Sequence, residues 1–242
     1  FETATGRLID SGGVRDPNHS PAAAGAVFGN TTYFHFLLEI VPRILLLKPY
    51  VRSVWLTGPI RPFHEELLNW LDVDYRLCCG QTCRLQNTMY LSCPGPYPNE
   101  HLVQKLSDAF RTQPPTSMSA DGVPRRLYLT RRNERARRVS NEAELIDMLS
   151  DYHFVSIDPG RMSLRDQFRH FANAEYIVAP HGAALSNIAM AQSPGPRVLE
   201  IVPRKQVKWH FALMSGILGY DYSFTRATNE GAEDLFADIA AI

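Results

Sequence analysis

The chain has 242 residues, of which 45% are hydrophobic, and its 25 Lys and Arg side chains balance 25 Asp and Glu side chains. The apolar fraction is that of an ordinary globular protein and excludes general disorder, while zero net charge argues against a dedicated nucleic-acid binder. The most apolar run, residues 36–47, is interrupted by Glu39, Pro42 and Arg43, so no stretch of the sequence is long enough to span a membrane.

Helical periodicity and β-rich runs alternate through the first half of the chain, which predicts an α/β domain. Residues 1–29 are expected to form extended strands and loops. A Pro- and Ser-rich stretch, residues 113–124, is typical of a linker and predicts two domains, residues 1–115 and residues 116–242. In the first domain we expect helices over residues 33–50, 62–71 and 98–111, and strands over residues 53–57, 74–78 and 88–92.

Strand and helix patterns alternate five times in the second half. This alternation predicts right-handed βαβ crossovers and a parallel, Rossmann-like sheet. Ser163 and Asp166, three residues apart, are typical of a capping box at the start of a helix. The expected strands are residues 126–130, 153–157, 176–179, 198–202 and 220–224, and the expected helices are residues 141–150, 164–173, 183–191, 207–218 and 232–242.

Basic side chains gather where the first strand of the second half ends. Residues 125–138 contain seven arginines and one acidic residue, and the strand runs directly into Thr130, Arg131 and Arg132. Ligands of open parallel sheets collect at the carboxyl ends of the strands, and arginines suit the bidentate grip of a phosphate. We therefore expect Thr130, Arg131, Arg132 and Arg138 to bind an anion. The alternatives are a solvated basic loop and a nucleic-acid patch, for which an aromatic stacking platform is missing.

Small residues follow the third strand of the second half, in the turn His181-Gly182-Ala183, and Asn187 lies in the next expected helix. Such a turn lets the backbone approach a ligand, and a helix N-terminus offers free N–H groups to a pyrophosphate. His181 is either a structural residue or a functional one that donates to phosphate or orients a sugar. In the fourth strand, Glu200 interrupts an apolar run, so we expect it to pair with an arginine or to bind the hydroxyls of a ribose.

His35 stands near the start of an apolar helix in the first half, where a neutral imidazole can accept a proton at physiological pH. It is the predicted general base, and the alternative is a histidine that only packs in the core. Asp16, in a glycine-containing loop, is the second candidate for the base, because a carboxylate can take the same proton.

The sequence also lacks several signatures. It contains no carboxylate cluster such as Asp-x-Asp at the carboxyl end of an expected strand, so we expect no metal and no cofactor. Absence of a P-loop, of G-x-S-x-G and of G-x-G-x-x-G after any strand disfavours an NTPase, a hydrolase and a dinucleotide-dependent dehydrogenase. Two α/β domains that grip a phosphate-bearing ligand without these motifs favour an enzyme that uses a nucleotide sugar.

Several segments, taken in order, resemble the family-61 glycosyltransferases. The first runs from Tyr33 through His35 and Glu39 to Pro42-Arg43 and is similar to the family's YYHWLLE-x-x-PR segment. Phe36 stands here for the usual tryptophan, and in a later segment Ala184 stands for a glycine. The other segments are residues 127–132, 138–145, 166–172, 177–187 and 198–200.

The resemblance implies a GT-B fold, in which two Rossmann-like α/β domains face a cleft. Residues 1–115 would then be the acceptor-side domain and residues 116–242 the domain that binds the nucleotide sugar. It also implies inverting transfer of a sugar from a nucleotide sugar, commonly UDP-linked, to a glycan or other hydroxyl acceptor. Such transfer serves polysaccharide or glycoconjugate biosynthesis. The alternative is a noncatalytic domain that binds a nucleotide sugar or polysaccharide on the same scaffold.

The family also bears on location and partners. Its members include plant xylan-decorating enzymes, animal O-linked N-acetylglucosamine transferases of the secretory pathway, and bacterial enzymes of polysaccharide biosynthesis. The resemblance therefore favours a cytoplasmic enzyme of the bacterial kind, or an enzyme of the Golgi or ER lumen if an anchor precedes Phe1. The expected partners are the nucleotide-sugar donor and the glycan or glycoconjugate acceptor. We expect no nucleic-acid partner, and a peripheral association with a membrane stays open.

Overall fold

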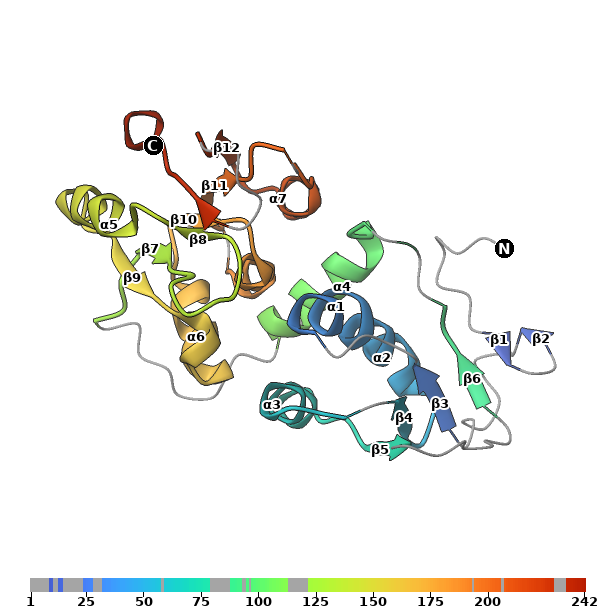
Figure 1. The fold of residues 1–242 in the computed structure, drawn as a ribbon. Helices are drawn as coiled ribbons and strands as arrows, with labels where there is room; N and C mark the ends of the chain where they lie inside the picture. The colour runs from blue at the N-terminus through green and yellow to red at the C-terminus, as the bar shows by residue number, and fades with distance from the viewer. Residues whose placement is uncertain are drawn as a thin grey trace. The chain divides into compact units, whose positions relative to one another are not determined.

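The computed structural model has two compact units, Phe1–Pro114 (unit 1) and Pro115–Ile242 (unit 2), each with its own sheet (Figure 1). Helices and parallel strands in both units confirm the α/β class. Within the described residues, no helix is both long and apolar enough to cross a bilayer. The structure describes residues 9–10, 13–14, 24–27, 32–57, 59–78, 88–92, 95, 97–112, 122–192, 194–205, 207–228 and 234–242.

Unit 1 is built on a sheet with the strand order β2-β1-β6-β3-β4-β5. Neighbours among β6, β3, β4 and β5 are parallel, and β1 and β2 extend the sheet antiparallel beside β6. The chain passes from β3 to β4 and β5 and then returns to the other side of β3 as β6. The strands are β1 (Ile9–Asp10), β2 (Gly13–Val14), β3 (Ala24–Val27), β4 (Val54–Thr57), β5 (Tyr75–Cys78) and β6 (Thr88–Tyr90). The carboxyl ends of β3 and β6 therefore flank a topological switch point, where open parallel sheets bind ligands.

A continuous helical segment follows β3, as expected, but its winding changes along its length. It consists of α1 (Tyr33–His35), the π-helix η2 (Phe36–Ile40), α2 (Val41–Leu47) and the 3₁₀-helix η3 (Lys48–Tyr50). Pro42 accounts for the wide turn, because it lacks an N–H and its ring would clash with the carbonyl four residues earlier in an α-helix. The remaining helices of the unit are α3 (Pro62–Trp70) and α4 (Glu100–Thr112), and α4 packs against α2.

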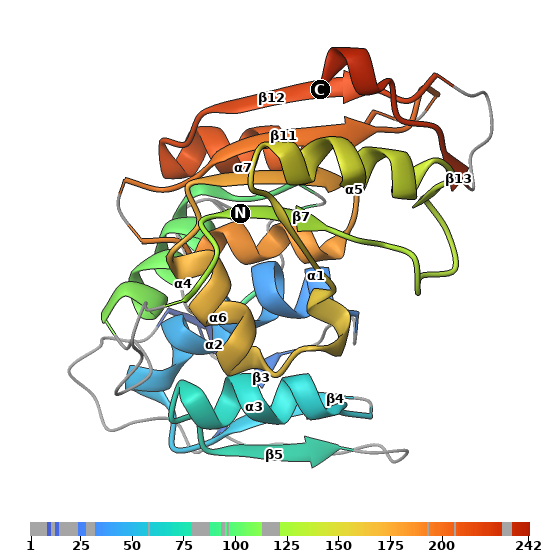
Figure 2. The ribbon, with the colours of Figure 1, turned by 90° about the vertical axis from the view of Figure 1, so that its left-hand side faces the viewer.

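Unit 2 is built on a fully parallel sheet with the order β12-β11-β10-β7-β9. Figure 2 shows β11 and β12 side by side with their arrowheads pointing the same way. The chain passes from β7 to β9 on one side and then to β10 on the other, so a second switch point lies at the carboxyl ends of β7 and β10. The strands are β7 (Arg126–Leu129), β9 (Val155–Ile157), β10 (Tyr176–Pro180), β11 (Arg197–Val202) and β12 (Tyr222–Arg226).

Helices cover the unit 2 sheet. Residues of α5 (Glu142–Asp151) share one buried cluster with Tyr128, Val178 and Ile201, and α5 and α7 (His210–Leu218) lie on opposite sides of the strands in Figure 1. The 3₁₀-helix η5 (Ala183–Met190) packs against both α6 (Leu164–Ala172) and α7. Two short 3₁₀-helices, η4 (Pro159–Arg161) and η6 (Ile239–Ala241), complete the unit.

The capping box of α6 is confirmed, since the Ser163 hydroxyl accepts from the Asp166 N–H at 3.1 Å and donates to its carboxylate at 2.6 Å. The expected helix over residues 183–191 is present and winds as a 3₁₀-helix. The last expected helix, residues 232–242, was wrong, because its described residues, 234–242, contain a strand and a single 3₁₀ turn. That strand, β13 (Asp234–Leu235), pairs with β8 (Arg138–Val139), a partner far away in sequence that local periodicity does not reveal.

Candidate active site

The side chain of Arg131, which follows β7, lies directly against the backbone of Gly182, which follows β10. A Cβ atom on Gly182 would stand 2.8 Å from Cζ of Arg131, so any larger residue there would displace this guanidinium from its position. Gly182 has an extended backbone with φ of −179°, so the close approach, and not an unusual backbone conformation, requires the glycine. Two segments expected to bind the donor therefore meet at the switch point of unit 2.

The charge of Arg131 is only partly compensated. Its side chain is 10% exposed, and Nη2 donates to the carbonyl of Ala136 at 3.0 Å, while the nearest carboxylate, that of Glu134, is 4.0 Å away. Burial and the neighbouring charge of Arg137 lower the pKa of the Arg131 guanidinium. Nε of Arg131 and Nε of Arg137 are both buried, and neither meets an acceptor among the described residues. A bound anion would supply the missing acceptors and relieve the repulsion.

Arg137 was not among the expected site residues, although it lies in the same arginine-rich segment. Its φ of +60° is in the left-handed region, which a bulky side chain enters at a cost of about 1–3 kcal/mol. Strained residues of this kind gather at ligand sites, where the surrounding structure holds them in place. Nothing in the sequence distinguishes Arg137 from its neighbours, because only the folded loop brings it close to Arg131.

Thr130 and Arg132 hold this loop to the first turn of α5. The Thr130 hydroxyl donates to Oε1 of the buried Glu142 at 2.6 Å, and Nε of Arg132 lies 3.3 Å from Oε2. The Tyr128 hydroxyl donates to the same carboxylate at 2.9 Å, and burial together with the Glu142 charge raises the pKa of Tyr128 above its usual range. Glu142, which lies in the family-like segment 138–145 but had no expected role, therefore fixes the position of the arginine loop.

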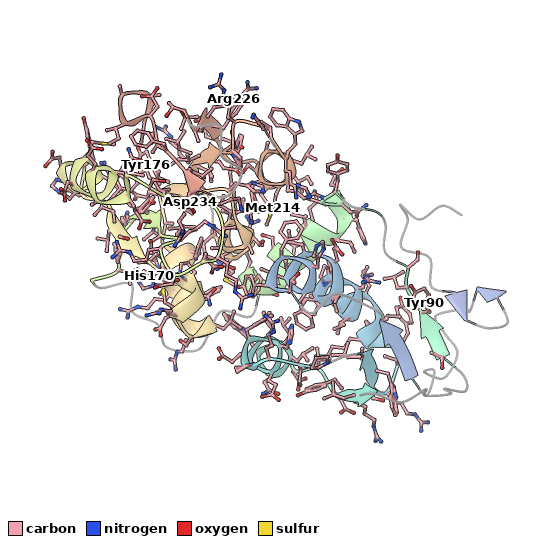
Figure 3. The ribbon with its side chains drawn as sticks, in the orientation of Figure 1. Tyr90, His170, Tyr176, Met214, Arg226 and Asp234 are labelled. Atoms are coloured by element: carbon pink, nitrogen blue, oxygen red, sulfur yellow. The ribbon has the colours of Figure 1, made fainter. Side chains whose placement is uncertain are left out.

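Arg138 has a carboxylate partner in the small β13-β8 sheet. Its Nε and Nη2 donate to Asp234, labelled in Figure 3, at 3.2 and 2.9 Å. These hydrogen bonds lower the pKa of the Asp234 carboxyl. Arg138 thus joins two chain segments almost a hundred residues apart, and its guanidinium is already engaged.

His181 is supported from behind by a buried hydrogen-bonded chain. Its Nδ1 bonds to Oε1 of Glu200, and the Tyr222 hydroxyl donates to Oε2 of the same carboxylate at 2.7 Å. Burial and the Glu200 charge raise the pKa of Tyr222 above its usual range. Because an ionised carboxylate only accepts, Nδ1 of His181 carries its proton, and Nε2 is the ring nitrogen that can meet a ligand.

This geometry changes the interpretation of Glu200. We expected an arginine partner or a ribose, but the partners are His181 and Tyr222, and Glu200 is fully buried with 0% exposure. A carboxylate without exposed surface acts on a ligand only through its neighbours, so Glu200 is a positioning residue for His181. Tyr222 was missed because no feature of the sequence marks this tyrosine as a hydrogen-bond partner of Glu200.

Asn187 and Ala183 are placed by packing within the turn after β10. The Asn187 side chain is fully buried and donates to Oε1 of Gln167 in α6 at 2.7 Å, which joins η5 to that helix. Ala183 begins η5, and the next backbone bond of this turn runs from the Leu185 N–H to the Gly182 carbonyl at 3.0 Å. These contacts hold Gly182 beneath Arg131.

In unit 1, His35 forms a pair with Glu39 across the π-helix. Nδ1 of His35 lies 2.6 Å from Oε1 of Glu39, and the two side chains are 39% and 20% exposed. The buried Arg43 donates from Nε to the Glu39 carbonyl at 2.6 Å and from Nη1 to the Leu91 carbonyl at 3.0 Å. Arg43 therefore ties the helix after β3 to the chain after β6 at the first switch point. The second candidate base, Asp16, lies outside the described residues.

Comparison with known proteins identifies the family of the chain. Residues 33–198 match the model of the family described as Glycosyltransferase 61. The chain belongs to the glycosyltransferase 61 family, which confirms the resemblance seen in the sequence. A β-1,2-xylosyltransferase from Arabidopsis thaliana is 29% identical over 111 residues, which cover 40% of this chain and 20% of the plant protein. The chain thus spans about a fifth of the length of this curated relative.

Substitution of Gly182 tests the contact with Arg131. Gly182→Ala should destabilise the protein by about 1–3 kcal/mol in urea unfolding, because the added methyl group displaces a buried guanidinium. Gly216→Ala in α7 is the matched control, since nothing lies within 4 Å of an added Cβ there. The double variant Gly182→Ala, Arg131→Ala should lose less than the sum of its single variants. Equal unfolding free energies for the two glycine variants would contradict the contact.

Proposed function

We propose that this chain transfers a sugar from a nucleotide sugar, UDP-linked, to a hydroxyl group of a glycan or glycoconjugate. The observation that carries the proposal is the pair of incompletely compensated guanidinium groups, Arg131 and Arg137, beside Gly182 at a switch point of the unit 2 sheet. Membership of the family and similarity to a protein named β-1,2-xylosyltransferase support glycosyl transfer. A role in polysaccharide or glycoconjugate biosynthesis is part of the same proposal.

The donor diphosphate would occupy the site of unit 2. Arg131 and Arg137 each offer an Nε–H without an acceptor among the described residues, and a protonated His181 would offer its Nε2–H from the neighbouring strand end. Arg132 and Arg138 already have carboxylate partners, so we assign direct contact to Arg131 and Arg137. Charge-assisted hydrogen bonds are the strong ones, and each one lost should cost about 1.5–3 kcal/mol.

His35 would act as general base in an inverting displacement. Its imidazole takes the proton of the acceptor hydroxyl while that oxygen attacks the anomeric carbon and the bond from this carbon to the phosphate oxygen breaks. Glu39 orients the ring through Nδ1 and stabilises the imidazolium that forms, as carboxylates do beside other catalytic histidines. The step requires the GT-B arrangement, with the acceptor carried by residues 1–115 and the donor by residues 116–242.

The leaving diphosphate would be neutralised by Arg131 and Arg137, so we propose transfer without a metal. Within the described residues, no three His, Cys, Asp or Glu side chains gather in a way that could hold a metal ion. Preorganised positive groups aimed at developing charge are a general means of stabilising a transition state.

Binding of UDP tests the assignment of the arginines. Arg131→Ala and Arg137→Ala should each weaken UDP affinity, measured by calorimetry, by roughly 10- to 150-fold, which corresponds to about 1.5–3 kcal/mol. Arg135→Ala, an exposed arginine of the same loop, is the matched control and should bind as the wild type does. UDP affinity that is unchanged in both Arg131→Ala and Arg137→Ala would place the donor elsewhere.

Turnover tests the assignment of the base. His35→Ala should lower the turnover number about 10²- to 10⁴-fold while UDP affinity stays unchanged, because only the proton transfer is lost. His101→Ala, at an exposed position of α4, is the control and should keep full turnover. If His35→Ala stays within about tenfold of the wild type while Asp16→Asn loses turnover, Asp16 is the base and His35 is structural.

Chelation tests the proposal of metal independence. Enzyme treated with EDTA should release UDP from the donor, in the presence of acceptor, at the rate of untreated enzyme, because the arginines carry the positive charge. Activity that disappears with EDTA and returns with Mn²⁺ would refute this part of the proposal. Binding of donor without UDP release across a broad acceptor panel would favour a noncatalytic binding domain.

A further inference from the structure

Unit 2 exposes a group of apolar side chains where α7 packs beside β12, the strand at one edge of its sheet. Trp209, the N-cap residue of α7, is 46% exposed, and Leu213 is 44% exposed. The Leu213 N–H donates to the Trp209 carbonyl at 2.9 Å, so the two side chains lie one turn apart on the same face of the helix. The Trp209 ring also meets Phe224 of β12, which is 40% exposed, with 5.7 Å between the ring centroids.

The packing of α7 against the sheet does not require these side chains. The buried face of the helix consists of Phe211, Met214 and Ser215. A helix at the surface of a soluble domain normally carries charged and polar side chains on its other face. The other face of α7 instead carries Trp209 and Leu213, and a contiguous exposed apolar surface of this kind marks a site of interaction.

Positive charge flanks the apolar side chains. Residues 203–213 and 222–228 contain no Asp or Glu, although the whole chain is neutral. Arg226 follows Phe224 by two residues and therefore lies on the same face of β12, and Figure 3 shows it at the rim of unit 2. The Lys and Arg side chains of these two segments are all exposed: Arg204, Lys205, Lys208 and Arg226.

No described carboxylate neutralises this charge. Arg204 donates to the Thr228 carbonyl at 3.4 Å, beyond the end of β12, and neither it nor Lys208 nor Arg226 forms an ion pair with a carboxylate in the described part of the chain. Arg125 and Arg197, in contrast, pair with Glu175 and Asp221. We call Arg204, Lys208, Trp209, Leu213, Phe224 and Arg226 the basic-aromatic patch. Its charge has one sign, which complements a surface of uniformly negative charge.

We propose that the basic-aromatic patch binds the surface of a membrane that contains anionic lipids. The basic side chains contact lipid phosphates, while Trp209 and Phe224 enter the interface between headgroups and acyl chains. Leu213 adds contact with the hydrocarbon. A soluble polyanion would satisfy the charges but leave Leu213 in water, so the apolar side chains favour the lipid. The inference goes beyond the proposed function and does not depend on it.

Fluorescence of the whole chain mixed with vesicles tests the inference. Of the three tryptophans, Trp209 is exposed and Trp55 and Trp70 are half-buried, so the emission should shift to shorter wavelength when Trp209 enters the interface. Vesicles of phosphatidylcholine and phosphatidylglycerol in equal parts should bind about tenfold or more tightly than phosphatidylcholine alone. The difference should vanish in about 1 M NaCl, where the Debye length is about 3 Å. Trp209→Phe should still sediment with the anionic vesicles but lose the spectral shift.

Variants of the patch test its residues in the sedimentation assay. Lys208→Gln and Arg226→Gln should each weaken binding to the anionic vesicles by roughly fivefold, because each removes one contact with the negative surface. Leu213→Ser should weaken it at least as much, because the contact with hydrocarbon is lost. Lys105→Gln, at an exposed position of α4, is the control for charge, and Tyr152→Ala, at a side chain with 58% exposure, is the control for apolar surface. Both controls should bind as the wild type does.

Equal binding to neutral and anionic vesicles would overturn the inference, as would binding that survives all three patch substitutions. Heparin that binds where the vesicles do not would also overturn it and assign the patch to a soluble polyanion. Titration with UDP separates this inference from the proposed function. Patch variants should keep the wild-type affinity for UDP, and a joint loss of UDP and vesicle binding would overturn the membrane assignment. Vesicle binding by a chain that does not bind UDP would support the patch and contradict the proposed function.

Discussion

The contact between the Arg131 guanidinium and the bare backbone of Gly182 joins the ends of two strands that are fifty residues apart in sequence. It places a buried positive charge beside a second one, on Arg137, with the Glu134 carboxylate only at 4.0 Å. Such an arrangement costs free energy in the empty protein, and that cost is offset when an anion arrives. The hydrogen-bonded networks around Glu142 and Glu200 hold the arginine loop and His181 in place. Repulsion between the charges of Arg131 and Arg137 would otherwise displace the loop.

Each unit has a topological switch point in its sheet, but the side chains at the two switch points differ. Each sheet reverses its strand order once, and each reversal carries the side chains that the sequence motifs had pointed to. Unit 2 places arginines, a glycine and a supported histidine there, which suits a diphosphate. Unit 1 places the His35–Glu39 pair there, and Arg43 ties the two sides together.

Much of this could be predicted from the sequence, and the reasons for the failures are physical. Alternating periodicity located the strands and most helices of residues 126–226, and the capping box at Ser163 was visible because its partners are three residues apart. The β8-β13 pair was missed because its strands are short and its contacts long-range. The π-helix was missed because a side-chain pattern does not report how widely the backbone winds.

In the candidate site too, some residues could be predicted from the sequence and others could not. Arg131, Gly182 and His181 could be expected because they follow strand ends, where parallel sheets bind ligands. Arg137, Glu142 and Tyr222 could not, since their roles come from a left-handed backbone and from partners that only the fold brings near. For Glu200, the apolar run around it predicted a buried carboxylate that needs a partner. The expected partner was an arginine or a ribose, because the sequence does not show that His181 and Tyr222 lie beside it.

The central claim is that unit 2 recognises the phosphates of a nucleotide sugar rather than its base alone. Calorimetric titration of the whole chain with UDP, UMP and uridine measures this most directly, because the three ligands differ only in phosphate. The account predicts affinity that falls in that order, by roughly tenfold or more at each step, as charge-assisted contacts are removed. Uridine that binds as tightly as UDP would contradict it.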